Sequence, residues 1–209
     1  MIFDLWETLI DWRHDANARM HARVNERVGF DFHERWSAAS TRYTEPVRTV
    51  LAGVGVTDDA MDDVMSYRAD FVRECLVPRD GAVETLEELR ARGCKVGLIT
   101  VCTEDVELLW PESAFAGLFD AEVFSNAVGL SKPDPRIYRL CCDELGVEPS
   151  EAVFVGDGAN DELEGARRVG LRPILIHKAG QDPVWPEVRS WDGVRVTSIP
   201  EVLEVLERC

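Results

Sequence analysis

The sequence predicts an α/β protein with a doubly wound, mainly parallel sheet and a separate group of helices. Short apolar runs and helical patterns alternate from about residue 79 to the C-terminus, with short loops between them. A short apolar run at the N-terminus ends in an aspartate, as a buried strand delivering a polar side chain would. Between these two parts, residues 12–78 show helical periodicity and no strand pattern.

The first element is the run Met1, Ile2, Phe3, which predicts a strand that ends at Asp4. In the stretch that follows, apolar residues recur at helical spacing, as in Val47, Val50 and Leu51. Glycines punctuate these patterns. We therefore expect a bundle of helices directly after the first strand.

Beyond the turn signal at 78–81, helices and strands are expected to alternate. The expected helices are 83–92, a short turn at 106–110, 136–145, 162–169 and 199–206, and the expected strands are 95–101, 121–124, 152–155 and 172–176. Alternation of this kind predicts a parallel sheet covered on both faces. Residues 178–192, rich in proline and tryptophan, are expected to form an irregular surface loop without an assigned role.

This order of elements predicts two domains. Residues 1–11 and 79–209 would form the α/β core, and residues 12–78 would form a helical cap inserted after the first strand. An insert at that point lies over the carboxyl ends of the strands, where open α/β sheets bind ligands.

The composition excludes some classes of partner. Among 209 residues, 39 are acidic and 23 are lysine or arginine, so the formal net charge is -16. Nucleic acid and anionic membranes would be repelled by such a surface. The six cysteines include no pair at metal-site spacing, which favours reduced thiols in a cytoplasmic protein. The apolar N-terminus is interrupted at once by Asp4 and Glu7, so we expect no signal peptide, and no apolar run is long enough to span a membrane.

Four polar residues lie at or just beyond the carboxyl ends of predicted strands: Asp4, Thr100, Lys132 and Asp157. Since these ends meet at one edge of a parallel sheet, the four side chains are expected to converge. Two carboxylates repel each other unless a cation lies between them, and Mg²⁺ prefers oxygen ligands. With a lysine and a hydroxyl nearby, the set suits attack by a carboxylate on phosphorus or on an activated carbon.

Each of these residues also has an ordinary structural explanation. An aspartate after a strand often caps a helix or forms a turn, and a lysine before a proline is by default a solvated surface residue. A threonine at a strand end is by default a β-former. The joint pattern is far less expected by accident than any single member of it.

Four segments resemble the haloacid dehalogenase-like hydrolase superfamily in order and spacing. They are IFDLWETL at 2–9, LIT at 98–100, SKPDPRIY at 131–138 and VGDGANDELEGA at 155–166. The resemblance covers nearly the whole chain, and it implies a Rossmann-like core with a cap, a Mg²⁺ cofactor and a small phosphorylated substrate.

The resemblance also implies roles for individual residues. Asp4 is the nucleophile, Thr100 holds the transferring group, and Lys132 orients both. The implied metal ligands are Asp4, the backbone carbonyl of Trp6, Asp157 and Asp161. Substrate contacts are implied for Trp6, Thr100, Val101 and Lys132.

Three positions depart from the family pattern. Trp6 stands where phosphatases of this family carry a second aspartate as general acid and base. Glu7 replaces the usual glycine, and its side chain is expected to point elsewhere, while Val101 replaces a common asparagine. Indole cannot take over the acid's role. The cap residues His14, Asp15, His21 and Glu26 are candidates by position only, and we favour a solvated helix face as their explanation.

Three functions remain open. The first is a magnesium-dependent phosphatase whose acid is missing or supplied elsewhere. The second is a 2-haloacid dehalogenase, a branch that has an aromatic residue at the position of Trp6 but works without magnesium and lacks the aspartate that Asp157 supplies. The third is a non-catalytic member that binds a phosphorylated ligand. We favour the first, because Asp157 beside Asp4 would be costly to bury without a cation.

Overall fold

In the computed structural model, which describes residues 1–181, 183 and 185–207, six parallel strands form one sheet in the order β3-β2-β1-β4-β5-β6. The strands are β1 (Ile2–Phe3), β2 (Gly97–Thr100), β3 (Ala121–Phe124), β4 (Val153–Gly156), β5 (Arg172–Ile176) and β6 (Val194–Val196). The chain starts in the middle of the sheet and builds outward first on one side and then on the other. This order confirms the doubly wound α/β fold.

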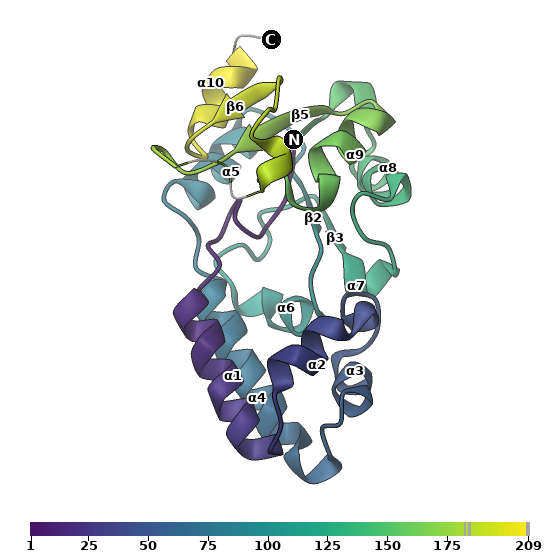
Figure 1. Ribbon diagram of the computed structural model, residues 1–209. Coiled ribbons are helices and arrows are strands. Elements are labelled where there is room, and N and C mark those ends of the chain that lie inside the picture. Colours follow the sequence, from purple (N-terminus) through teal and green to yellow (C-terminus); the bar gives the residue numbers. More distant parts are fainter. Residues whose placement is uncertain (182, 184, 208–209) are drawn as a thin grey trace.

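Helices cover both faces of the sheet (Figure 1). The α-helices beyond residue 79 are α5 (Ala82–Ala91), α6 (Glu104–Leu109), α7 (Ser125–Val128), α8 (Pro135–Leu145), α9 (Glu162–Val169) and α10 (Glu201–Glu207). Short 3-10 helices are η1 (Ser40–Tyr43), η2 (Trp110–Glu112), η3 (Pro149–Glu151), η4 (Ala159–Asp161) and η5 (Pro186–Val188). None of the described helices combines the length and the apolar character needed to cross a bilayer.

Alternate strand residues pack into two separate apolar clusters, one on each face. Phe3, Leu98 and Val155 belong to the cluster shared with α5, whereas Ile2 and Ile99 belong to the cluster shared with α8 and α9. This division follows from the period of two along a strand, which sends neighbouring side chains to opposite faces. The sheet is therefore buried on both faces, as a parallel sheet requires.

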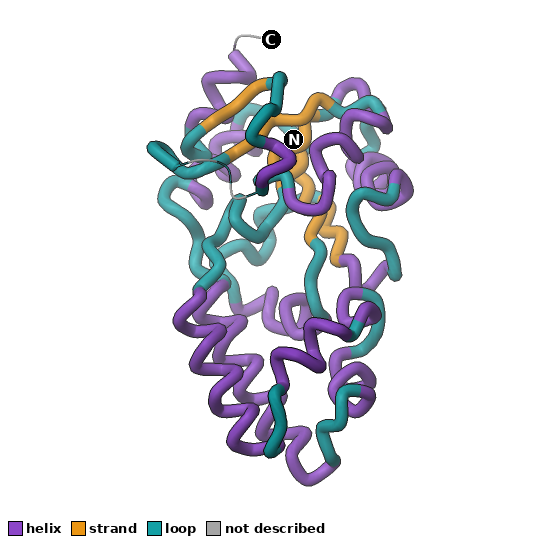
Figure 2. Tube along the Cα trace, viewed as in Figure 1, coloured by secondary structure: helices purple, strands orange, loops and turns teal. Residues whose placement is uncertain are grey.

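Between β1 and β2 the chain forms four α-helices, α1 (His14–Val28), α2 (Phe32–Ala38), α3 (Val47–Gly53) and α4 (Asp58–Cys75). We call α1–α4 the helical insert. Figure 2 shows it as a group of helices and loops at one end of the molecule, with the strands at the other. In α1 the buried residues are Ala16, Met20 and Val24, four apart, so one stripe of the helix faces α4.

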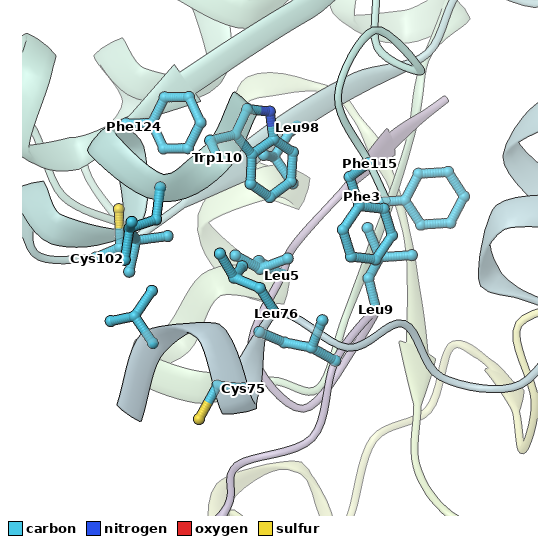
Figure 3. Close-up of a cluster of buried hydrophobic side chains, with 14 of the residues drawn as sticks. Phe3, Leu5, Leu9, Cys75, Leu76, Leu98, Cys102, Trp110, Phe115 and Phe124 are labelled. Carbon is cyan, nitrogen blue, oxygen red and sulfur yellow. The ribbon is translucent and has the colours of Figure 1, made fainter. Parts of the chain in front are cut away.

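The apolar cluster on one face of the sheet continues into the helical insert. Figure 3 shows part of it, with Phe3, Leu5 and Leu98 from the sheet region and Cys75 and Leu76 from the end of α4. The insert is thus joined to the sheet by packing as well as by its two connections.

The expected elements from residue 79 onward are all present, with boundaries shifted by at most two residues. Two were missed. The short strand β6 lies at the sheet edge, where most of its side chains are exposed and leave no apolar run, and α7 has only four residues. The cysteines Cys75, Cys94, Cys102, Cys141 and Cys142 are free thiols, and Cys209 lies outside the described residues.

Candidate active site

Asp4 lies at the middle of the sheet, directly after the buried residues Ile2 and Phe3 of β1. Its backbone N–H donates to the carbonyl of Val155 at 2.8 Å, so β4 holds the residue beyond the last paired position of β1. The side chain is only 4% exposed. An aspartate this buried requires a partner for its charge.

Lys132 supplies that partner. It follows β3 and α7 in the chain, is 6% exposed, and places its ammonium against Oδ1 of Asp4 and at 2.5 Å from Oε2 of Glu162. Burial alone would lower the pKa of Lys132, but the charges of Asp4 and Glu162 outweigh it and hold that pKa above its ordinary value. The lysine is therefore a fixed cation between two carboxylates.

Asp157 and Glu162 reach the same place from the end of β4. Oδ1 of Asp157 accepts from the backbone N–H of Ala159 at 3.1 Å, and Oε1 of Glu162 accepts from that of Gly158 at 2.9 Å. Glu162 can come this close only because Gly156 has no side chain, since a Cβ there would overlap the Glu162 carboxylate. The sequence from Gly156 to Glu162 thus forms a turn that folds both carboxylates inward.

The electrostatics of this turn reflect crowding of negative charge. Burial, followed by the charge of Asp4, raises the pKa of Asp157 to about 6. Burial also raises the pKa of Glu162, and the charges of Asp4 and Asp157 add to the effect of burial. Lys132 offsets only part of this charge, so the group favours the arrival of a further cation.

Among the described residues, carboxylate oxygens of Asp4, Asp157 and Glu162 lie within 4.8 Å of one another. If all three are ionised, Lys132 neutralises one charge and a divalent cation would neutralise the other two. Oxygen ligands at this density suit Mg²⁺, which prefers carboxylates and retains several waters. The residues present therefore fit a magnesium ion.

Thr100, at the end of β2, is fully buried, and its hydroxyl makes no hydrogen bond of ordinary geometry within the described residues. Its neighbour is the thiol of Cys102, a weak acceptor. A buried hydroxyl without a strong partner is costly, so this one is free to donate to a bound anion. Val101 directly follows β2 and is half-buried.

Trp6 packs against another aromatic ring. Its ring lies 5.1 Å from that of Trp12, which in turn lies 5.4 Å from the ring of Phe71 in α4. Glu7, the nearest acidic side chain in sequence, pairs with Arg79 at 2.8 Å and accepts from the backbone N–H of Trp12. Position 6, where phosphatases of this family carry a general acid, is thus occupied by an aromatic side chain that joins a row of rings leading to α4 of the helical insert.

One expected metal ligand is not part of the group. Asp161 is exposed, and Glu162 occupies the place beside Asp4 and Asp157. The reason is local conformation: Asn160 and Asp161 both adopt left-handed φ values, 52° and 55°, which turn Asp161 outward and start α9 with Glu162 inward. From sequence, Glu162 had the ordinary explanation of an acidic residue in the first turn of a helix.

The four residues of α1 that were considered as acids are exposed or pack within the helical insert. His14, Asp15 and Glu26 are exposed, and Asp15 pairs with Arg19 at 2.8 Å. His21 is half-buried and packs its ring against those of His33 and Phe32 within the helical insert. These positions support the solvated or packed explanation.

Sequence reasoning also missed Trp185, whose indole N–H donates to Oδ2 of Asp157 at 2.7 Å. It belongs to the stretch expected to be an irregular loop. A lone tryptophan in a proline-rich segment carries no pattern that would direct it to a residue 28 positions away.

Comparison with known proteins gives a consistent result. The model of the family described as haloacid dehalogenase-like hydrolase matches residues 1–170. Similar curated proteins include a phosphoserine phosphatase of Thermus thermophilus, 35% identical over 120 residues, and an (S)-2-haloacid dehalogenase of Burkholderia cepacia, 34% identical over 103 residues. The matches cover 56% and 49% of this chain, and 46% and 44% of those relatives, about half their length.

A solved structure of a phosphatase from Thermococcus onnurineus superposes with a TM-score of 0.75 at 20% identity, covering 98% of this chain and 96% of that one. At this identity the likeness concerns the fold alone.

Proposed function

Because the chain belongs to the haloacid dehalogenase-like hydrolase family, and is therefore a hydrolase, we propose that it is a magnesium-dependent phosphatase acting on a small phosphorylated metabolite. The observation that supports this proposal is the convergence of Asp4, Asp157 and Glu162 around Lys132. Such a group accommodates a divalent cation and an anionic substrate together. We also propose that residues 12–78 form a cap over the core, and that the protein works in the cytoplasm.

Asp4 is the proposed nucleophile. Lys132 holds Oδ1, which leaves Oδ2 to attack the phosphorus of the substrate, forming an aspartyl-phosphate as the bond to the leaving oxygen breaks. Lys132 and the hydroxyl of Thr100 donate to the non-bridging oxygens as charge develops on them. Water then cleaves the aspartyl-phosphate, which releases inorganic phosphate and restores Asp4.

Asp4, Asp157, Glu162 and the carbonyl of Trp6 would hold the magnesium ion. When bound, Mg²⁺ would neutralise charge on the phosphoryl group and orient it for in-line attack. In the metal-free protein, Lys132 alone compensates the carboxylates, so binding of substrate and cation is expected to be mutually favourable.

The leaving oxygen must take its proton from water, since Trp6 offers neither an acid nor a base. The protein would therefore work best on phosphates with good leaving groups, such as acyl or aryl phosphates. Replacing Trp6 with aspartate is expected to raise turnover of poor leaving groups by roughly 10²–10⁴-fold. An unchanged or lower rate would show that an acid is supplied from elsewhere or that the side chain at 6 cannot reach.

The direct test is magnesium-dependent phosphate release from a panel of aryl, acyl and alkyl phosphates, with Asp4→Asn as the inactive control. The proposal fails if wild-type protein releases no phosphate from any member of the panel.

A 2-haloacid dehalogenase is the second candidate, favoured by the aromatic ring at Trp6 and by similarity to the Burkholderia dehalogenase. Halide release from 2-chloropropionate that persists in EDTA would identify it. The buried carboxylates of Asp157 and Glu162 argue against a dehalogenase that works without metal. Their burial is unfavourable without a bound cation, whereas with one they can act as its ligands. Ligand-dependent thermal stabilisation without turnover would instead identify a non-catalytic binding protein.

A further inference from the structure

Asp157 receives a hydrogen bond from a part of the chain that local sequence does not connect with it. Trp185, just before η5, donates from Nε1 to Oδ2 of Asp157 at 2.7 Å. Indole has a single donor, and here that donor points at the carboxylate of Asp157, a residue grouped with Asp4 and Glu162. The contact therefore belongs to the group of residues that fits a metal ion.

The segment that carries Trp185 is anchored on the same turn. Val188, 7% exposed, packs on Gly158, where a Cβ would lie 2.6 Å from the valine side chain. Trp191, 8% exposed, stacks under the guanidinium of Arg167 at 4.2 Å and donates to the carbonyl of Val194 at 3.2 Å. With Val188 held against the residue that follows Asp157, the indole of Trp185 has a fixed approach.

The ring of Trp185 itself contributes little to the core. It is 37% exposed, whereas Val188 and Trp191 belong to the buried cluster on the α8–α9 face of the sheet. If packing were its only role, the indole N–H would be expected to face water. Its direction toward Asp157 is the feature that packing does not explain.

Two donors fix the plane of the Asp157 carboxylate. Ala159 N–H holds Oδ1 and Trp185 holds Oδ2. A carboxylate has about four lone-pair sites, so each oxygen can still bind a cation. Groups that hold a metal ligand in this way typically contribute about 10–100-fold to metal affinity.

We propose that Trp185 is a positioning residue of the magnesium site, acting through its hydrogen bond to Asp157. The inference rests on the proposed metal-dependent function and deepens it. It assigns a role to a stretch that none of the four sequence motifs includes.

The test compares the same substitution, tryptophan to phenylalanine, at two positions of one segment. Trp185→Phe and Trp191→Phe each keep an aromatic ring and lose one indole N–H, but only the first N–H contacts Asp157. Mg²⁺ binding is measured directly by isothermal titration calorimetry, without substrate. We expect the Kd of Trp185→Phe to rise about 10-fold or more, and that of Trp191→Phe to stay within about twofold of wild type.

A second readout separates positioning from folding. Thermal unfolding in EDTA should give Trp185→Phe a midpoint close to that of wild type, because Trp185 is 37% exposed and an aromatic ring remains at this position. Mg²⁺ titration followed by tryptophan fluorescence should change emission in wild type and Trp191→Phe, and the change should be smaller in Trp185→Phe.

An unchanged Mg²⁺ affinity in Trp185→Phe would overturn the inference while leaving the metal site in place, provided that Asp157→Asn abolishes binding. Equal weakening in both phenylalanine variants, together with lower midpoints in EDTA, would also overturn it by pointing to folding. Absence of Mg²⁺ binding by wild type would remove the proposed function and this inference with it.

Discussion

Arg68 and Asp105 form a buried ion pair between the helical insert and the sheet-bearing part of the protein. Arg68 lies on α4 and Asp105 on α6, and their Nη2 and Oδ2 atoms are 2.7 Å apart with 4% and 3% of the side chains exposed. The guanidinium also stacks on Trp36 at 4.0 Å and donates to Thr103 at 3.2 Å. Thr103 lies three residues after Thr100, so this pair joins the insert to the edge of the site.

Replacing Arg68 with methionine removes the charge but keeps an unbranched side chain against Trp36. Within the part of the chain that the structure describes, Asp105 would then remain buried with the Thr103 hydroxyl as its one side-chain partner. Breaking a buried pair in this way costs about 3–5 kcal/mol. For a chain of this length, 1 kcal/mol corresponds to about 2–4 °C, so the unfolding midpoint should fall by about 6–20 °C.

Urea unfolding followed by circular dichroism measures this loss. The matched control is Arg48→Met, which breaks the exposed pair with Asp62, whose side chains are 57% and 88% exposed, and should cost less than about 1 kcal/mol. Adding Asp105→Leu to Arg68→Met should recover most of the stability, since the uncompensated charge is gone. A loss under about 1 kcal/mol for Arg68→Met, or no recovery in the double variant, would refute the reasoning.

Three further predictions follow from the site and the insert. Mg²⁺ at about 100 times its Kd should stabilise the protein by about 2.7 kcal/mol, which corresponds to a rise of roughly 5–11 °C in the unfolding midpoint. Asp157→Asn should abolish this rise, and a rise that survives the substitution would place the cation elsewhere. Gly156→Ala should cost about 1–3 kcal/mol in urea unfolding and weaken Mg²⁺ binding, because the new methyl overlaps Glu162, whereas Gly53→Ala, with open space around it, should not destabilise. Burial, then the neighbouring charges of His33 and Arg68, lowers the pKa of His21 below its usual 6.5. The unfolded chain therefore binds the proton more readily than the folded protein, and the free energy of unfolding should fall as pH drops below about 6.5. In His21→Gln that fall should be smaller, and a pH profile identical to that of wild type would contradict the prediction.

The sequence predicted the fold well because the relevant signals are local. Apolar runs ending in a polar residue located β1 and β4, and glycines marked the ends of α8 and α9, the helices on either side of β4. Once a parallel sheet was expected, its geometry required Asp4, Lys132 and Asp157 to meet at one edge. In the structure these three residues do meet: Lys132 contacts Asp4 and Glu162, and carboxylate oxygens of Asp4, Asp157 and Glu162 lie close together.

Where prediction failed, the outcome depended on backbone conformation at single residues. Asp161 and Glu162 are adjacent acidic residues, and the choice between them rests on the left-handed conformations of Asn160 and Asp161. Gly156 is also decisive, because it leaves the space that the Glu162 carboxylate fills. Hydrophobic periodicity does not encode either feature.

By itself, the sequence determined the parallel α/β fold, the helical insert after the first strand and the positions of the strand-end carboxylates. Each of these follows from patterns within a few residues, repeated along the chain. Only the tertiary structure decided that Glu162 completes the carboxylate group, that Trp185 holds Asp157, and that Arg68 joins the insert to α6. These contacts depend on the directions in which side chains leave a folded backbone, and such directions exist only once distant segments have packed together.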